Sequence, residues 1–327
     1  MDSITQAALG ASIAGVCAPA GQRRKALLAG AMLGTLPDLD VVIDYGSDVA
    51  NFTYHRGFSH SLLVLALFSF LLWLALRRWW APVRNAPRAW LAAITLTLLT
   101  HPLLDAHTVY GTQLFWPIPR APEMWSTLFI VDPLYTLPLI ISVIAATLAP
   151  RRVLLLRAGL ALSTLYIGWS WFGKTIVEDH ARESLAMQGL EDRPMFSSPT
   201  ALNTMLWRVV VLTDEGYLEG FDSLLVDEGP MRFKAYPSDK AALQAASSIW
   251  AVDRLRWFTR DLMRVTVEDD LLVLADLRMG QEPNYVFTHV VAERDNSHWR
   301  ERPDHLLPFE FEDRALRATW DRIWSAQ

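Results

Sequence analysis

Long apolar runs separated by short polar loops fill the first half of the chain. Four runs of about 20 apolar residues cover positions 61–80, 88–106, 128–149 and 153–172. Two weaker runs cover positions 4–20, which are rich in alanine and glycine, and positions 25–43, which carry Asp38 and Asp40 near one end. A helix that crosses a bilayer core needs about 20 mostly apolar residues. The pattern therefore predicts about six membrane spans within residues 1–173.

The second half of the chain has the pattern of a soluble domain. LWRVVVLT, YLEGFDSLLV and MRFKAY are short segments rich in valine, leucine and aromatic residues, and DEG and DEGP turns join them. They predict a β-meander. A helix is predicted over residues 238–262, further strands in MRVTVED, LLVLADLR and NYVFTHVVA, and a terminal helix in RALRATWDRIWSA. We therefore predict a polytopic α-helical membrane domain (1–173) followed by a soluble α+β domain with a mainly antiparallel sheet (174–327).

Composition and charge change in the same place. The chain is 52% hydrophobic, with a mean hydropathy of +0.18. Residues 1–173 hold 12 of the 30 lysine and arginine residues and 8 of the 35 acidic residues, a net charge of +4, whereas residues 174–327 have a net charge of −9. An acidic domain is a poor nucleic-acid binder, because that function favours basic faces. The single cysteine, Cys17, excludes an intrachain disulfide and a cysteine-built zinc site.

The loops between the predicted spans differ in charge. The alternate loops 44–60 and 107–127 carry only two basic residues. Basic loops remain in the cytoplasm, so loops 44–60 and 107–127 are predicted to face outward. With an even number of remaining crossings, the C-terminal domain is predicted to be extracytoplasmic. The ten basic residues of the other loops are Arg23, Arg24, Lys25, Arg77, Arg78, Arg84, Arg88, Arg151, Arg152 and Arg157.

Carboxylates and imidazoles gather at the outward ends of the predicted spans. Ionisable groups at membrane depth are costly, so by default they suggest a functional site. Asp132, at the outward start of the fifth span, could join the group or serve as a helix cap. His107, just after the fourth span, could lie in an outer shell. The six residues that converge are Asp38, Asp40, His55, His60, His101 and Asp105.

The chemistry of this group suits a divalent metal ion. Histidine nitrogens together with aspartate oxygens favour Zn²⁺, with Mn²⁺ or Fe²⁺ as alternatives. His101 and Asp105 are four residues apart, which is one face of a continuous helix, although Pro102 disfavours helical geometry at His101. Arg56 supplies a planar cation suited to phosphate or carboxylate. Ser59 and Ser61 could orient the ligands as hydrogen-bond donors.

Four motifs together resemble a known family. MDSITQAALGAS, GTLPDLD, YHRGFSHS and HPLLDAHTVYG are similar to the YdjM-type bacterial inner-membrane proteins, over roughly residues 1–145. The family is described as membrane-bound metal-dependent hydrolases, and the resemblance implies ligands at Asp38, Asp40, His55, His60, His101 and Asp105. Many members carry a histidine after a threonine near the N-terminus. Here Gln6 follows Thr5, and Asp2 could replace the missing ligand.

The leading hypothesis is a metal-dependent hydrolase of the bacterial inner membrane with its active site at the outer face. A bound metal would activate water, Asp40 or Asp105 would take the proton, and Arg56 would stabilise developing negative charge. Because the site lies at headgroup level, the expected substrate is a lipid or lipid-linked ester, with a phosphoester favoured. Two alternatives stay open, a structural metal site combined with a soluble binding domain, and an ion or metal transporter.

Overall fold

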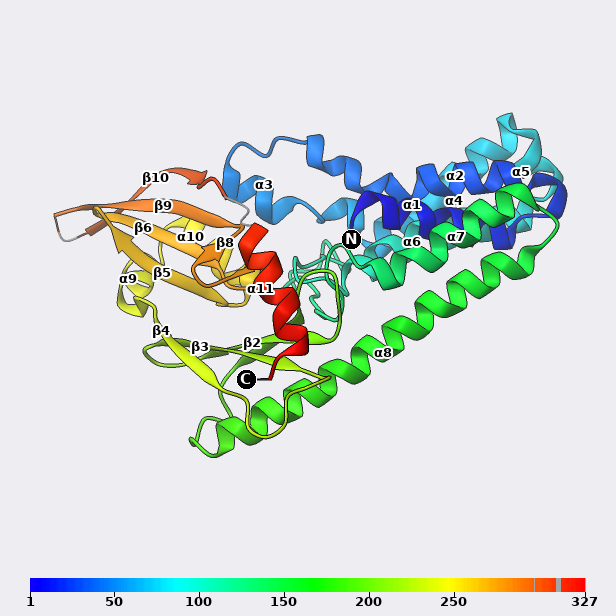
Figure 1. Ribbon diagram of the computed structural model, residues 1–327. Coiled ribbons are helices and arrows are strands. Elements are labelled where there is room, and N and C mark those ends of the chain that lie inside the picture. Colours follow the sequence, from blue (N-terminus) through cyan, green and yellow to red (C-terminus); the bar gives the residue numbers. More distant parts are fainter. Residues whose placement is uncertain (297, 310–312, 327) are drawn as a thin grey trace. The chain divides into compact units, whose positions relative to one another are not determined.

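The chain forms two compact units in the computed structural model, which describes residues 1–296, 298–309 and 313–326 (Figure 1). The helical unit comprises Met1–Val42 and Arg56–Ser170, and the sheet unit comprises Ile43–His55 and Trp171–Gln327. The segment Ile43–His55 therefore leaves the helical unit and belongs to the sheet unit.

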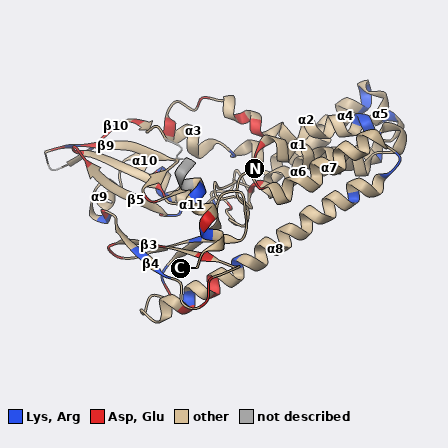
Figure 2. Ribbon diagram, in the orientation of Figure 1, with Lys and Arg blue, Asp and Glu red and all other residues tan. Residues whose placement is uncertain are grey.

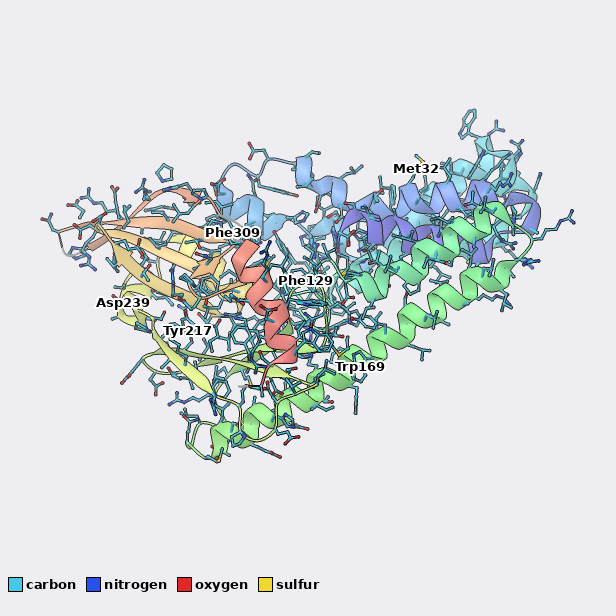
Figure 3. The ribbon with its side chains drawn as sticks, in the orientation of Figure 1. Met32, Phe129, Trp169, Tyr217, Asp239 and Phe309 are labelled. Carbon is cyan, nitrogen blue, oxygen red and sulfur yellow. The ribbon has the colours of Figure 1, made fainter. Side chains whose placement is uncertain are left out.

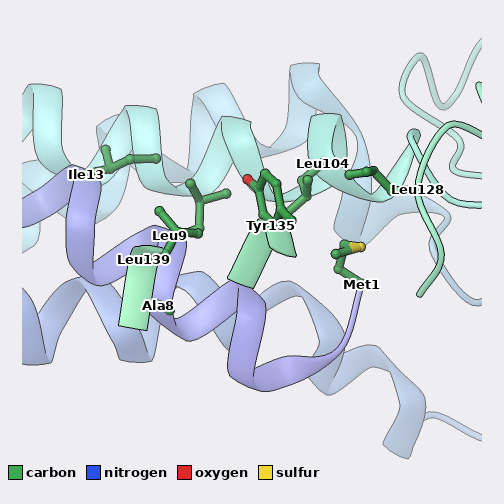
Figure 4. Packing of buried hydrophobic residues seen from close by; sticks show 8 residues of the cluster. All are labelled: Met1, Ala8, Leu9, Ile13, Leu104, Leu128, Tyr135 and Leu139. Atoms are coloured by element: carbon green, nitrogen blue, oxygen red, sulfur yellow. The ribbon is translucent and has the colours of Figure 1, made fainter. Parts of the chain in front are cut away.

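Helix α1 is the central element of the helical unit and contacts α2, α6 and α7. Leu9 of α1, Leu104 of α6 and Leu139 of α7 meet in a buried cluster that also includes Tyr135 (Figure 4). The helices of the unit are α1 (Ser3–Cys17), α2 (Arg23–Thr35), α4 (Leu62–Trp79), α5 (Ala81–Asn85), α6 (Pro87–Asp105), α7 (Pro133–Leu148) and the first part of α8 (Val153–Ala186), with the 3-10 helices η1 (Ala20–Gln22), η2 (Pro37–Val42) and η3 (Phe58–His60).

Side-chain caps fix where these helices begin. Asp2 accepts hydrogen bonds from the amides of Ile4 and Thr5 at the start of α1, and Ser61 accepts one from Val64 at the start of α4. Such caps satisfy amides that have no partner within the helix. Asp2 therefore acts as a helix cap. It is not among the four residues that cluster as candidate metal ligands, so it does not replace the N-terminal histidine of the family there.

Helices α1 and α2 approach each other at their backbones. A Cβ atom on Gly30 would lie 2.2 Å from the carbonyl oxygen of Gly10. Small residues allow this approach, as is common between membrane helices. On the opposite side of α2, Met32 points outward and is 66% exposed (Figure 3), so apolar side chains cover the outside of the unit as well as its core.

The prediction of about six membrane spans is wrong. Only two helices in the described part of the chain are long and apolar enough to cross a membrane, Leu62–Trp79 and Val153–Ala186. Helices α1, α2 and α7 contain 15, 13 and 16 residues, and at a rise of about 1.5 Å per residue they fall short of a core about 30 Å thick. Helix α6 has 19 residues but carries His101 and Asp105. The apolar runs 4–20 and 25–43 extend past Pro19 and Pro37, whereas helices α1 and α2 end two residues before these prolines.

The sheet unit contains two four-stranded antiparallel sheets, with strand orders β1-β2-β3-β4 and β10-β9-β6-β5, and the hairpin β7-β8. The helix predicted over residues 238–262 is divided between α9 and α10. The elements are β1 (Met195–Pro199), β2 (Leu206–Leu212), β3 (Gly216–Ser223), β4 (Phe233–Pro237), α9 (Lys240–Ala245), α10 (Trp250–Thr259), β5 (Met263–Glu268), β6 (Leu271–Asp276), β7 (Gly280–Gln281), β8 (Asn284–Tyr285), β9 (Thr288–Asp295), β10 (His298–Leu306) and α11 (Asp313–Trp324).

Helix α3 (Asp48–Tyr54) anchors the segment Ile43–His55 in the sheet unit. The ring of Phe52 stacks on that of Phe287, with centroids 4.3 Å apart. Arg254 donates from Nε to the Thr53 hydroxyl at 2.9 Å, and its guanidinium lies 4.3 Å from the ring centre of Tyr54. The metal-site motifs on either side of this segment are thus joined by a loop that the C-terminal chain binds.

Candidate metal centre

Four side chains of the helical unit meet with the spacing of metal ligands. One ligand atom from each of Asp38, His60, His101 and Asp105 lies within 4.8 Å of all the others. The Nε2 atoms of the two histidines are 3.1 Å apart. Asp38 Oδ1 is 3.4 and 3.3 Å from them, and Asp105 Oδ2 is 3.2 and 3.6 Å from them. Four tetrahedral ligands about 2.0–2.1 Å from a Zn²⁺ ion are separated by about 3.3–3.4 Å, so these distances fit one such ion.

The 3-10 helix η2 separates the two aspartates of the LPDLD motif. In a 3-10 helix, side chains three residues apart lie on one face. Asp40 therefore shares the buried face of Pro37, while Asp38 occupies a neighbouring face. The side chain of Asp38 is 19% exposed, whereas those of His60, His101 and Asp105 are fully buried. Solvent therefore has access to the cluster on the Asp38 side.

A chain of hydrogen bonds orients His60. The Ser59 hydroxyl donates to Asp40 Oδ2 at 2.5 Å and lies 2.9 Å from His60 Nδ1. Since the serine proton is used on the carboxylate, Nδ1 of His60 must be the donor to the serine oxygen. In the neutral imidazole this leaves the lone pair on Nε2, which faces the cluster. Asp40 thus lies behind His60, with Oδ2 3.8 Å from Nδ1.

His101 is oriented in the same way by the backbone. Its Nδ1 lies 2.6 Å from the carbonyl oxygen of Gly34, which can only accept, so Nε2 again carries the lone pair. Helix α6 continues through Pro102, and its turn brings Asp105 to the same face as His101. The two facing imidazole nitrogens repel each other unless a proton or a metal ion lies between them.

The two carboxylate oxygens of Asp105 differ in their contacts: Oδ1 accepts hydrogen bonds, whereas Oδ2 faces the cluster. Gln6 donates from Nε2 to Asp105 Oδ1 at 2.9 Å, and the amine of Met1 donates to the same oxygen at 2.5 Å. Oδ2 is buried and has no hydrogen-bond partner in the described part of the chain. Arg56 Nε lies 3.3 Å from Oδ2 but makes no hydrogen bond to it. A cation at the cluster would supply the direct partner that this buried oxygen lacks. The residues present therefore fit a divalent metal ion.

The charges of the cluster also favour a cation. Burial raises the pKa of Asp38, but the nearby imidazoles of His101 and His60 outweigh this and hold that pKa well below its usual value. Burial lowers the pKa of His60, but hydrogen bonding to Asp105 and Asp38 raises it overall. The pKa of Asp105 is likewise held well below its usual value, because nearby positive charges, that of Arg56 foremost, together outweigh the effect of burial. Asp38 and Asp105 thus stay ionised, and their negative charge favours a cation at the cluster.

Arg56 lies beside the cluster in a constrained conformation. Its φ of 59° is left-handed, which is uncommon for a residue with a side chain. Its Nε is 3.3 Å from Asp105 Oδ2, its Nη1 donates to the Thr108 hydroxyl at 3.3 Å, and its guanidinium lies 5.0 Å from the ring centre of Tyr110. These contacts fix a cationic group at the edge of the candidate metal centre.

The remaining candidate residues lie elsewhere. His55 belongs to the sheet unit and is not among the four clustered residues. Asp132 caps α7, accepting from the amides of Leu134 and Tyr135. His107 lies 2.7 Å from the Thr127 hydroxyl through Nδ1. The contacts of the Met1 amine and of Gln6 with Asp105 have no signal in the pattern of titratable residues, and Gln6 stands out in the sequence only through the family resemblance.

Sequence comparisons agree with this picture of the helical unit. The profile of the YdjM inner membrane protein family matches residues 1–177, more than half of the chain. The chain belongs to the YdjM inner membrane protein family. The resemblance found in the four motifs is therefore confirmed, and the matched region of this YdjM family member contains all four clustered side chains.

A curated relative is also named as an inner membrane protein. This YdjM family member is 38% identical over 98 residues to inner membrane protein YbcI of Escherichia coli (strain K12). The alignment covers 30% of this chain and 55% of YbcI, so the chain spans about half the length of that relative. No solved structure matches the chain. The family and the relative both identify an inner membrane protein, which accords with the two candidate spans.

Proposed function

We propose that this protein is a membrane-bound metal-dependent hydrolase whose active centre is the cluster of Asp38, His60, His101 and Asp105. The observation that carries the proposal is the spacing of the four ligand atoms. The five pairs that involve a histidine are 3.1–3.6 Å apart, and all pairs lie within 4.8 Å. A bound Zn²⁺, Mn²⁺ or Fe²⁺ would polarise the scissile group and lower the pKa of a bound water towards about 7.

The chain's own residues would supply the rest of the chemistry. Arg56 would bind an anionic group of the substrate and stabilise charge that develops during hydrolysis. Asp105 is less suited to accept a proton than the sequence suggested, because its Oδ1 already receives two donors. Asp40 is linked to the cluster through Ser59 and His60. Because Nε2 of a metal-bound His60 has no lone pair left to relay a proton, Asp40 is assigned the role of orienting this ligand rather than that of a base.

The surroundings of the cluster favour a lipid or lipid-linked ester. His60 lies two residues before α4, the candidate span Leu62–Trp79, which supports a position of the cluster at the end of a membrane span. On the open side, Val41 lies one turn beyond Asp38 on the same face of η2. Leu39, Val41 and Val42 are 59%, 71% and 80% exposed. A metal site whose partly exposed ligand, Asp38, is followed by exposed apolar side chains, with an arginine beside the site, suits an amphiphile with an anionic ester such as a phosphoester.

Hydrolysis by metal-loaded protein tests the proposal. Purified protein loaded with Zn²⁺ or Mn²⁺ should hydrolyse a fluorogenic phospholipid in mixed micelles, and Asp38→Ala and His101→Ala should reduce the rate to background. Asp44→Ala, an exposed aspartate of the sheet unit, should leave it unchanged. A wild-type protein that binds metal tightly but cleaves neither lipid nor soluble esters would instead have a structural metal site.

A further inference from the structure

A basic pocket lies in the helical unit, away from the metal centre. It has a volume of about 930 Å³, and it is lined by residues of the α1–α2 turn and the α7–α8 turn. The metal centre contacts the first turns of α1 through Gln6, whereas the pocket lies beyond the other end of that helix. Its lining is Ala20, Gly21, Arg24, Lys25, Ala149, Pro150, Arg151 and Arg152.

Hydrogen bonds between the two turns hold the pocket open. Arg23 is buried, and it donates from Nε to the carbonyl of Gly15 at 2.9 Å. The same guanidinium donates to the carbonyl of Pro150. Arg24 donates from Nε to the carbonyl of Thr147 at 3.0 Å. The walls are therefore fixed by the protein itself before any ligand binds.

The positive charge of the pocket is not neutralised by acidic residues. Residues 3–37 and 133–177, which include both turns, helices α1, α2 and α7 and all but the last nine residues of α8, contain no aspartate or glutamate. Figure 2 shows the basic residues gathered at this end of the helical unit and acidic residues near the N-terminus of α1. Helices α2 and α8 begin at the pocket, at Arg23 and Val153, and their N-terminal dipoles add positive potential.

The apolar border of the pocket indicates a lipid. Leu28 follows Arg24 by one helical turn and is 66% exposed. Leu148 and Leu154 flank the α7–α8 turn and are 78% and 72% exposed. A free inorganic anion would make no favourable contact with these leucine side chains, whereas the acyl chains of a lipid would cover them. Basic ends of membrane helices face the cytoplasm, where the leaflet carries anionic lipids.

We propose that this pocket binds the phosphate headgroup of an anionic glycerophospholipid of the inner leaflet, with Arg24, Lys25, Arg151 and Arg152 around the phosphate. The assignment does not depend on hydrolysis at the metal centre, because it concerns other residues at the other end of α1. It gives the protein a resident lipid that ties the α1–α2 turn to the α7–α8 turn.

Titration of the full-length, delipidated protein with phosphatidylglycerol, followed by native mass spectrometry, tests the proposal. Wild type should bind one phosphatidylglycerol far more tightly than phosphatidylcholine. Each neighbouring cation contributes about fivefold, the equivalent of about 1 kcal/mol. Arg151→Gln/Arg152→Gln should thus weaken binding about 30-fold, and the single exposed change Lys25→Gln about fivefold.

A second pair of adjacent arginines provides the matched control. Arg77 and Arg78 end the other candidate span but do not line the pocket. Arg77→Gln/Arg78→Gln should change the affinity less than threefold. Equal loss in both double variants would show a diffuse charge effect and overturn the pocket. Displacement of the lipid by millimolar inorganic phosphate would overturn the lipid assignment in favour of a free-anion site. Unchanged phosphatidylglycerol affinity in Arg151→Gln/Arg152→Gln and in Lys25→Gln would overturn the pocket and the lipid assignment alike.

Discussion

Asp40 and Asp38 are two residues apart, yet the structure gives them different roles. Asp38 contributes a ligand atom to the cluster, whereas Asp40 Oδ2 accepts from the Ser59 hydroxyl at 2.5 Å and from the Arg56 amide at 3.0 Å. Asp40→Asn replaces a charged acceptor with a neutral one, and a hydrogen bond to a charged group contributes about 1.5–3 kcal/mol. His60 then loses the partner that holds its tautomer through Ser59.

The expected effect follows from that geometry. Substitution of residues that orient a metal ligand lowers metal affinity about 10–100-fold, or about 1.4–2.7 kcal/mol. We expect this loss for Asp40→Asn, and a loss at least tenfold larger for Asp38→Asn, which removes a ligand. Zinc titration of the detergent-solubilised protein against a chromophoric chelator measures both. Asp44→Asn, which changes an exposed aspartate of the sheet unit, should shift the affinity less than twofold.

Two results would refute the reasoning. If Asp40→Asn and Asp38→Asn lowered the affinity equally, Asp40 would be a ligand in its own right, as the sequence suggested. If Asp40→Asn had no effect, the hydrogen-bond chain through Ser59 would not orient His60.

Three further predictions concern packing, the anchored segment and pH. Gly30→Ala places a methyl group against the Gly10 carbonyl and should destabilise the helical unit by about 1–3 kcal/mol in thermal unfolding. Gly168→Ala, whose methyl group meets open space, should not destabilise it; equal effects of the two variants would contradict the close approach of α1 and α2. Arg254→Ala removes two hydrogen bonds to α3, a loss of about 2 kcal/mol, which should speed amide hydrogen exchange of residues 48–54 about 30-fold. Unchanged protection of these amides would show that Arg254 does not anchor the segment. Burial lowers the pKa of His289 to about 4 in the folded protein, whereas the unfolded chain, with a pKa of about 6.5, gains a proton between pH 7 and pH 5, so the free energy of unfolding of the sheet unit should fall by about 2 kcal/mol over this range. Urea unfolding at the two pH values should show this loss in wild type and not in His289→Gln; a loss that persists in the variant would assign it to other groups.

The pH prediction depends on all the charges around His289. Asp304, Asp276 and Asp48 favour its protonated form, and His305 opposes it. Burial outweighs them, because the residue is 1% exposed and its Nε2 has no hydrogen-bond partner among the described residues. A folded-state pKa below the unfolded value means that the stability is complete above about pH 6.5 and is lost as the pH falls towards 4.

The sequence predicted the meeting of distant carboxylates and imidazoles but not its details. The apolar runs placed His60 just before one helix and His101 and Asp105 at the end of the next, as observed for α4 and α6. The six spans from which a common level was inferred were wrong. The separation of Asp38 from Asp40 depends on η2 being a 3-10 helix, in which residues two apart face different directions. A short apolar and acidic stretch gives no signal for that geometry.

Other details depend on contacts between segments far apart in the chain. His55 and His60 stand in one motif, but the chain between them turns at Arg56 with a φ of 59°, and His55 belongs to the sheet unit. Gln6 carries no charge, so its bond to Asp105 could not be found from titratable residues. The number of spans was overestimated because hydropathy alone does not show that helices α1 and α2 end at Cys17 and Thr35.

Metal analysis of the purified protein, combined with X-ray absorption spectroscopy, tests the central claim most directly. We expect about one divalent ion per chain, bound by two imidazole nitrogens and by carboxylate oxygens at about 2.0–2.1 Å, and lost when any of Asp38, His60, His101 or Asp105 is changed to alanine. Protein that binds no ion after incubation with Zn²⁺, Mn²⁺ or Fe²⁺, or that keeps its ion in all four variants, would contradict it.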